Sequence, residues 1–132
     1  MAPLLIVDSA NVVGSVPDGW WRDPVGAAER LRDSLAPVAE AGLVGQAEEL
    51  AVPLEVVLVV EGAARGVQSS DDVRVVAASG SGDDTIVDLV RPTVGARICA
   101  VVTADRGLRD RVSDYGAQVL GPRSLPYAGR RP

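Results

Sequence analysis

The chain has 132 residues, a length that suits one domain built around one hydrophobic core. Its formal net charge of −5 argues against a protein that finds nucleic acid through a broad positive field. The sequence contains no His, no Lys and one Cys, which excludes a disulfide within the chain and leaves carboxylates as the main candidates for catalysis.

The single cysteine and the absence of targeting signals indicate a compartment. Cys99 lies inside an apolar run, where a thiol behaves as a small hydrophobe, and a chain without disulfides suits a reducing environment. The N-terminus has no basic segment followed by a long apolar stretch, and no segment is long enough to span a bilayer. We therefore expect a cytoplasmic protein with no membrane partner.

Strands and helices alternate along the predicted chain. In chain order we expect a strand at 4–8, a loop at 9–23, a helix at 24–41, a helical turn at 46–51 and a strand at 54–60. A polar loop at 63–72 follows, and then a strand at 73–78, a helix at 83–91, a strand at 96–103, a helix at 106–115 and a strand at 118–120. The first helix starts at Asp23-Pro24, ends at Gly42 and contains Pro37, which favours a kink or an early end.

This alternation predicts an α/β fold. Short apolar runs rich in Val and Ile are typical of buried parallel strands, and the intervening helices would cover both faces of the sheet. We expect a three-layer α/β/α sandwich with a mostly parallel central sheet. The domain is predicted to cover residues 1–125, with residues 126–132 forming a flexible tail.

Aspartates stand at the carboxyl ends of two predicted strands. Asp8 ends the first apolar run, and Asp105 lies just beyond the run that contains Cys99. Asp83 and Asp84 begin the helix after the turn SGSG. Because functional groups collect at the carboxyl ends of parallel strands, these side chains are expected to converge on one site. Such oxygen ligands suit Mg²⁺ or Mn²⁺, which can activate water for attack on a phosphodiester without a nucleophilic side chain.

Capping is the alternative role for these aspartates. Asp83, Asp84 and Asp105 all stand where helices begin, and a carboxylate there stabilises the helix N-terminus. Asp8 is interpreted differently, because a loop is expected after it and a carboxylate beside a buried strand is unfavourable unless it is paired or bound to metal. Taken together, the four positions favour a functional site.

In order along the chain, several segments resemble the NYN domains, which are PIN-like nuclease relatives, and most closely their YacP-like branch. LLIVDSANVVGS resembles the opening strand with its Asp, a small residue, any residue and Asn. VVAASGSGDDTIVDLV and CAVVTADRGLRDRV resemble the second and third motifs, and GAQVLGPRSL resembles the last strand.

This resemblance implies a PIN-like fold and a metal-dependent ribonuclease that uses Mg²⁺ or Mn²⁺. By position, Asp8, Asp84 and Asp105 would be catalytic metal ligands, with Asp83 as a further metal-ligand candidate. Asn11 would orient the loop of Asp8 or a metal-bound water. Because PIN-like domains often pair, the resemblance also implies a homodimer as a candidate assembly.

Arginines and tryptophans are candidates for contact with RNA. Arg106, next to Asp105, and Arg65, in the loop after the second strand, suit bidentate contacts with phosphate, although solvated ion pairs are the alternative. Trp20 and Trp21 either stack on an unpaired base or cover the edge of the core. The hydroxyl of Thr103 either donates to Asp105 or a metal-bound water, or caps the next helix.

Three functions remain open on the sequence. The leading hypothesis is the ribonuclease, which includes toxin components of the same fold. The second is a non-catalytic RNA- or protein-binding module, which the acidic net charge favours. The third, a haloacid-dehalogenase-like phosphatase, ranks low because Ala10 stands where those enzymes need a second Asp.

Overall fold

A five-stranded parallel sheet forms the centre of the molecule. The computed structural model describes the backbone of residues 1–129 and the side chains of residues 1–127. The strands are β1 (Leu4–Asp8), β2 (Glu55–Val60), β3 (Val73–Ala77), β4 (Cys99–Val102) and β5 (Gln118–Leu120), and their order in the sheet is β3-β2-β1-β4-β5. All five predicted strands are confirmed, and the sheet is entirely parallel.

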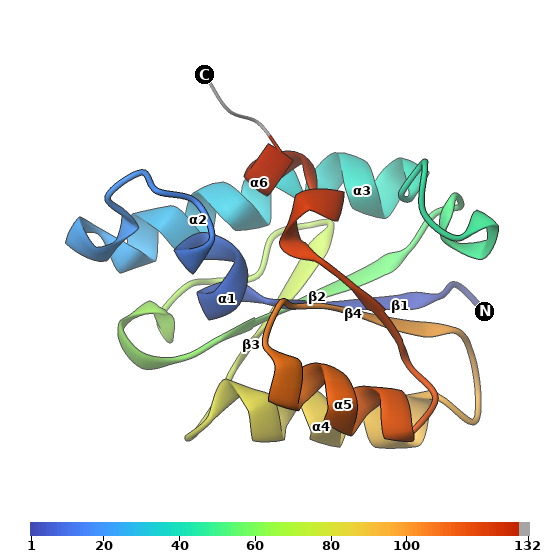
Figure 1. The fold of residues 1–132 in the computed structure, drawn as a ribbon. Coiled ribbons are helices and arrows are strands. Elements are labelled where there is room, and N and C mark those ends of the chain that lie inside the picture. Colours follow the sequence, from blue (N-terminus) through green and yellow to red (C-terminus); the bar gives the residue numbers. More distant parts are fainter. Residues whose placement is uncertain (130–132) are drawn as a thin grey trace.

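Helices cover both faces of the sheet, as predicted for a three-layer sandwich (Figure 1). On one face lie α2 (Pro24–Ser34), α3 (Ala36–Ala41) and α6 (Pro126–Gly129), and on the other lie α4 (Gly82–Thr93) and α5 (Arg106–Asp114). A short helix α1 (Ser9–Gly14) continues directly from β1. The 3₁₀ helices are η1 (Trp20–Arg22), η2 (Glu48–Leu50), η3 (Gly62–Ala64) and η4 (Pro122–Ser124).

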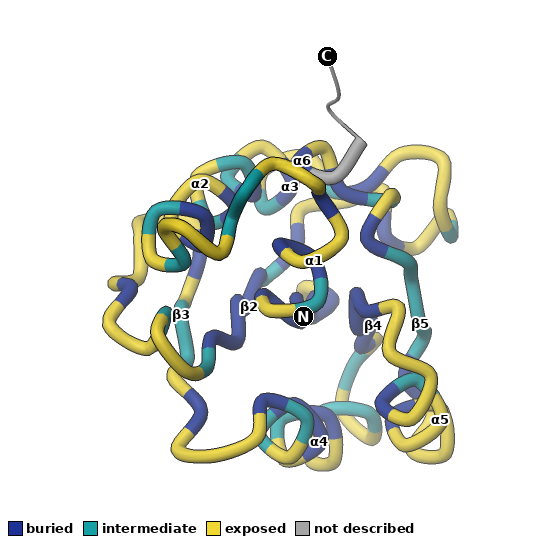
Figure 2. The backbone as a smooth tube through the Cα atoms, turned by 60° about the vertical axis from the view of Figure 1, so that its left-hand side comes forward, coloured by how far each residue is buried: buried dark blue, intermediate teal, exposed yellow. Residues whose placement is uncertain are grey.

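Each face of the sheet has its own aliphatic core. Successive side chains of a strand point to opposite faces, so Leu5 and Val7 belong to the core beneath α2 and α3, whereas Leu4 and Ile6 belong to the core above α4 and α5. Figure 2 shows the central strands buried and much of the edge strands β3 and β5 only half-buried. No helix within residues 1–129 is long and apolar enough to cross a membrane.

Prolines modify two helices in different ways. The predicted helix at 24–41 is divided at Leu35, and Pro37 lies in the first turn of the second part, α3, where a proline lacks no needed donor. Gly42 ends α3 with a positive φ of 84°, as predicted. Pro92 does not close α4 as expected, because it lies in the last turn and the helix continues to Thr93.

Two predictions about coil segments are wrong. Residues 9–14, expected in a loop, form α1, and buried Val12 and Val13 anchor this helix in the core. Residues 126–129, assigned to a flexible tail, form α6, and Tyr127 is buried. The domain boundary after Leu125 is therefore too early. The remainder of the predicted tail, residues 130–132, lies outside the described residues.

Candidate active site

The order of the strands reverses at β1, which has β2 on one side and β4 on the other, and the ends of β1 and β4 lie side by side. β1 lies between β2 and β4, and Val7 pairs with Val102, so that the next residues, Asp8 and Thr103, stand at the same sheet edge. The chain leaves β1 toward one helical layer and reaches β4 from the other (Figure 1). In open parallel sheets a crevice for ligands forms at such a point, and the predicted adjacency of these strands is confirmed.

Asp8 is a buried carboxylate at this edge, with only 7% of its surface exposed. Oδ2 accepts a hydrogen bond from Oγ1 of Thr103 at 2.9 Å, and Oδ1 accepts a longer one from the backbone N–H of Asn11 at 3.4 Å, which makes Asp8 the N-cap of α1. Burial raises the pKa of Asp8 to about 6. The two hydrogen bonds lower the pKa, whereas the charges of Asp83 and Glu61 raise it.

Thr103 and Asn11 connect Asp8 to the loop after β4. Oγ1 of the fully buried Thr103 donates to Asp8 and also accepts from the backbone N–H of Asp105 at 3.1 Å. The side-chain oxygen of Asn11 accepts from the backbone N–H of Ala104 at 2.7 Å. These bonds hold α1 against the loop before α5, so both residues predicted to support the site lie beside its central carboxylate.

Further carboxylates approach Asp8 from other segments. Asp105 caps α5, with Oδ1 accepting from the N–H of Leu108 at 2.9 Å, and Asp83 lies in the first turn of α4. Burial raises the pKa of Asp83, and the charges of Asp105 and Glu61 raise it further, against the lowering effect of Arg111. The mutual effects on pKa show that Asp8, Asp83, Asp105 and Glu61 share one region of negative potential.

Glu61 is a member of this cluster that the sequence analysis did not assign to the site. It follows β2, and Oε1 accepts a hydrogen bond from the backbone N–H of Gly82 at 2.6 Å. A Cβ at position 82 would lie 2.7 Å from that oxygen, so a larger residue there would displace the Glu61 carboxylate. The signal was present in the sequence, because Glu61 directly follows an apolar strand just as Asp8 ends one.

Asp84 faces a different partner. Its Oδ1 forms an ion pair with Nη2 of Arg111 at 3.0 Å across α4 and α5, and both side chains are largely exposed. The adjacent Asp83, rather than Asp84, acts on the pKa of Asp8. The geometry therefore associates Asp83 more directly with the buried carboxylate, and the assignment of Asp84 as a ligand stays a prediction.

The arginines predicted to bind RNA each lie close in sequence to a carboxylate of the cluster. Arg106 is the exposed first residue of α5, directly after Asp105, and Arg65 is exposed at the end of η3, the turn that follows Glu61. No ion pair joins either one to an acidic group among the described residues. Arg109 instead donates from Nη1 to the backbone oxygen of Thr103 at 3.0 Å.

The donor set fits a hard cation in chemistry but does not form a closed cage. Carboxylate oxygens are the ligands that Mg²⁺ prefers, and a bound cation would relieve the repulsion that raises the pKa of Asp8 and Asp83. Within residues 1–129, no three acidic or Cys side chains are placed to hold one ion together. Mg²⁺ is usually held by one or two carboxylates with several waters, so the arrangement suits a partly hydrated ion.

Comparison with known proteins finds a similar fold. The sequence matches no protein-family model and no curated protein. The fold is similar to the crystal structure of Rae1 (YacP) from Bacillus subtilis, solved as a W164L mutant, with a TM-score of 0.64 and 19% sequence identity. The similarity covers 92% of this chain and 70% of that one. The protein therefore has a YacP-like α/β fold.

Proposed function

We propose that this protein is a metal-dependent ribonuclease that hydrolyses RNA phosphodiester bonds. One observation carries the proposal: the Asp8 carboxylate is only 7% exposed at the sheet edge where β1 and β4 end side by side, and it lies within the electrostatic influence of Glu61 and Asp83. The sequence resemblance to YacP-like ribonucleases and the YacP-like fold support the same reaction class. If the cluster served only the fold, replacing its buried charges by neutral side chains would make the protein more stable, so a role in the fold alone does not account for them.

The residues have distinct roles in this proposal. Asp8, Asp83 and Asp105 would bind a partly hydrated Mg²⁺ or Mn²⁺, directly or through its waters, with Glu61 beside them and Asp84 as a further candidate. The cation supplies a water of lowered pKa and neutralises charge that develops on the phosphate. Thr103 and Asn11 keep the Asp8 carboxylate and the loop at 103–105 in place. Arg65 and Arg106, which are both exposed, contact the phosphates of RNA.

The test compares two aspartate variants with the same change in charge. Asp8→Asn should lower cleavage of single-stranded RNA in Mg²⁺ or Mn²⁺ by roughly 100- to 1,000-fold, on the scale of removing one transition-state-stabilising group. Asp114→Asn, at an exposed position in the last turn of α5, is the control and should cleave normally. Full cleavage by the folded Asp8→Asn variant, or equal cleavage in the presence of a chelator, would contradict the proposal.

A non-catalytic RNA- or protein-binding module is the second candidate. It is favoured by the capping roles of Asp8 and Asp105, each of which accepts a hydrogen bond from the first turn of a helix. Titration with Mn²⁺ distinguishes the two functions, because an ion that binds only the folded state raises the melting temperature. A rise that is lost in Asp8→Asn supports the ribonuclease. Unchanged melting together with retained RNA binding supports the module.

A further inference from the structure

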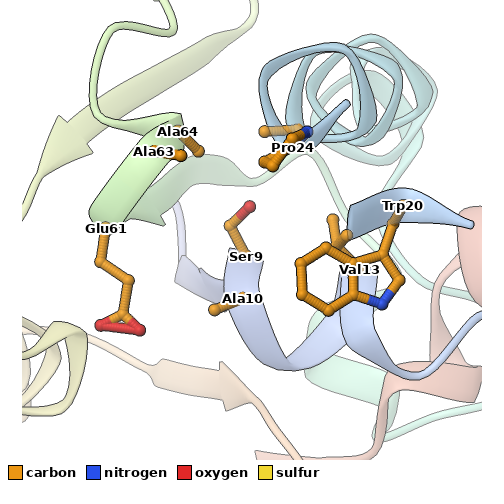
Figure 3. Close-up of a pocket in the computed structure, with 9 residues that line it drawn as sticks. Ser9, Ala10, Val13, Trp20, Pro24, Glu61, Ala63 and Ala64 are labelled. Carbon is orange, nitrogen blue, oxygen red and sulfur yellow. The ribbon is translucent and has the colours of Figure 1, made fainter. Parts of the chain in front are cut away.

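An apolar recess of about 140 Å³ lies directly beside the carboxylate cluster (Figure 3). Small side chains line it, and Figure 3 shows the Trp20 ring at one side and Glu61 at the other. Its floor includes Ser9 and Ala10, the two residues that follow Asp8. The recess therefore shares Glu61 and the start of α1 with the proposed active site.

The size of the recess restricts what can enter it. Pockets for drug-sized ligands measure about 300–1,000 Å³, so this one accepts a single flat ring system or one side chain. A base that is paired within a duplex cannot leave its helix without losing its stacking and pairing. Among nucleic acids, an unpaired base of a single strand is therefore the group that can occupy the recess.

Ser9 offers a polar contact inside this apolar surface. The residue is only 2% exposed, and within the described part of the chain its hydroxyl makes no hydrogen bond. Figure 3 shows this hydroxyl pointing into the recess, toward Ala64 and Pro24. This hydroxyl is not among the described side-chain atoms that are fully buried without a partner, so it keeps contact with solvent through the recess. A ligand with donors and acceptors along its edge, as a nucleobase has, can take the place of that solvent.

The loop beside the recess carries groups suited to the neighbouring nucleotide. The ring of Trp21 stands edge-on to Trp20 at 6.2 Å between centroids and is 59% exposed. The guanidinium of Arg22 lies 5.7 Å from the centroid of Trp21. Aromatic rings and arginines bind single-stranded RNA by stacking on bases and by contacting phosphate. Trp21 and Arg22 therefore extend the candidate binding surface from the recess toward the next nucleotide.

We propose that the recess is a subsite for one unpaired nucleobase of the RNA, belonging to a nucleotide that flanks the scissile phosphate. This inference rests on the proposed ribonuclease function and assigns its substrate class, single-stranded RNA. Trp20 forms the aromatic wall against the base, and the Ser9 hydroxyl bonds to the edge of the base. Unlike a protein side chain, an RNA strand would place its phosphate next to Asp8 while its base fills the recess.

The experiment combines a filled recess with removal of single bases. In the Asp8→Asn background, assayed in a chelator so that the RNA stays intact, affinity is measured for a short single-stranded RNA and for a series in which each nucleotide in turn lacks its base. Ala63→Leu extends a side chain from the exposed lining residue Ala63. Ala51→Leu is the matched control, because Ala51 is exposed near the start of β2, away from the recess.

The expected result is a coupling at one position. Removing one particular base should weaken binding by roughly 5- to 150-fold, the range for loss of a stacked base, in the parent and in Ala51→Leu but not in Ala63→Leu. Ser9→Ala should weaken the binding of intact RNA by a smaller factor, roughly 2- to 12-fold. This loss should disappear for the RNA that lacks the same base. Equal effects of each base removal with and without Ala63→Leu would overturn the proposal, as would preferential capture of a hydrophobic peptide.

Cleavage by chains that retain Asp8, with and without Ala63→Leu, separates this inference from the proposed function. RNA that is cleaved at the same rate whether or not the recess is filled would overturn the subsite and leave the ribonuclease intact. Position-specific coupling without any metal-dependent cleavage would support the subsite and remove the ribonuclease. Absence of both binding and cleavage of single-stranded RNA would overturn both.

Discussion

Asp8→Asn should make the protein more stable at neutral pH. Asparagine keeps the shape of the side chain and is as good an N-cap as aspartate, so α1 retains its cap. The variant loses the charge that burial and the neighbouring carboxylates disfavour. Most single substitutions destabilise a protein, so a gain at a buried position would be diagnostic of a residue kept for its function.

The size of the gain follows from the pKa. Burial raises the pKa of Asp8 from 3.8 to about 6, which corresponds to about 3 kcal/mol in favour of the unfolded state at pH 7. The single amide oxygen of asparagine cannot serve both Thr103 and Asn11, and one lost hydrogen bond removes about 1 kcal/mol of that gain. The free energy of unfolding should therefore rise by about 2 kcal/mol.

The pH dependence gives the prediction its sign. Between pH 4 and pH 6, values set by 3.8 for the unfolded chain and about 6 for the folded chain, the folded state holds the Asp8 proton more tightly. The contribution of Asp8 to stability therefore falls as pH rises through this window and stays low above it. Asp8→Asn should lose this part of the profile, so its advantage should shrink toward pH 4.

Urea unfolding of wild type, Asp8→Asn and Asp114→Asn from pH 4 to pH 8 in a chelator measures these differences. The exposed control should stay within about 0.5 kcal/mol of wild type. Parallel pH profiles for wild type and Asp8→Asn, or an Asp8→Asn variant less stable than wild type at pH 7, would refute the reasoning. Either result would make Asp8 a structural residue.

Two further predictions concern the support of Asp8 and the contacts with RNA. Thr103→Val should destabilise the protein by about 1.5–3 kcal/mol at pH 7 and by less at pH 4, because the lost hydrogen bond stabilises ionised Asp8. Thr103→Ser, which keeps the hydroxyl, is the control. An equal loss of stability at both pH values in urea unfolding would contradict this role. Arg65 and Arg106 as the two main phosphate contacts predict that log K for single-stranded RNA falls with log salt at a slope of about −1.4, measured by anisotropy titration. Removing one contact in Arg106→Ala should bring the slope to about −0.7. A much steeper slope in the wild type would contradict this, because it would require a basic surface that neither arginine provides.

The sheet was predictable because its signals are local. Each strand is a short run of aliphatic residues bounded by polar or turn residues, and runs as continuous as LLIV are buried on both faces. The strand ends were less certain, and the predicted 96–103 became Cys99–Val102. Helix α1 was missed because Asn11, Gly14 and Pro17 are typical of loops. A helix of six residues is stabilised by tertiary packing rather than by propensity, here through buried Val12 and Val13.

The candidate site was predictable to the level of which segments meet, but not of how side chains point. The carboxyl ends of strands converge in any parallel sheet, which places Asp8 and Asp105 near each other without further information. Choosing between Asp83 and Asp84 depends on Arg111, which lies on another helix and pairs with Asp84. Such a contact between distant segments leaves no periodic signal in the sequence.

The acidic net charge, which argued against RNA binding by a broad positive field, is compatible with a contact-based mode. The carboxylate cluster repels phosphate until a cation neutralises it, so attraction to RNA must come from elsewhere. The apolar recess lined by Trp20 and Ser9 can supply it without charge, since burial of a base is insensitive to the sign of the surrounding field. Cluster and recess share the start of α1, so a base held in the recess would hold its own phosphate against the cluster. Recognition and chemistry would then depend on the same six-residue helix, in which Val12 and Val13 are buried in the core.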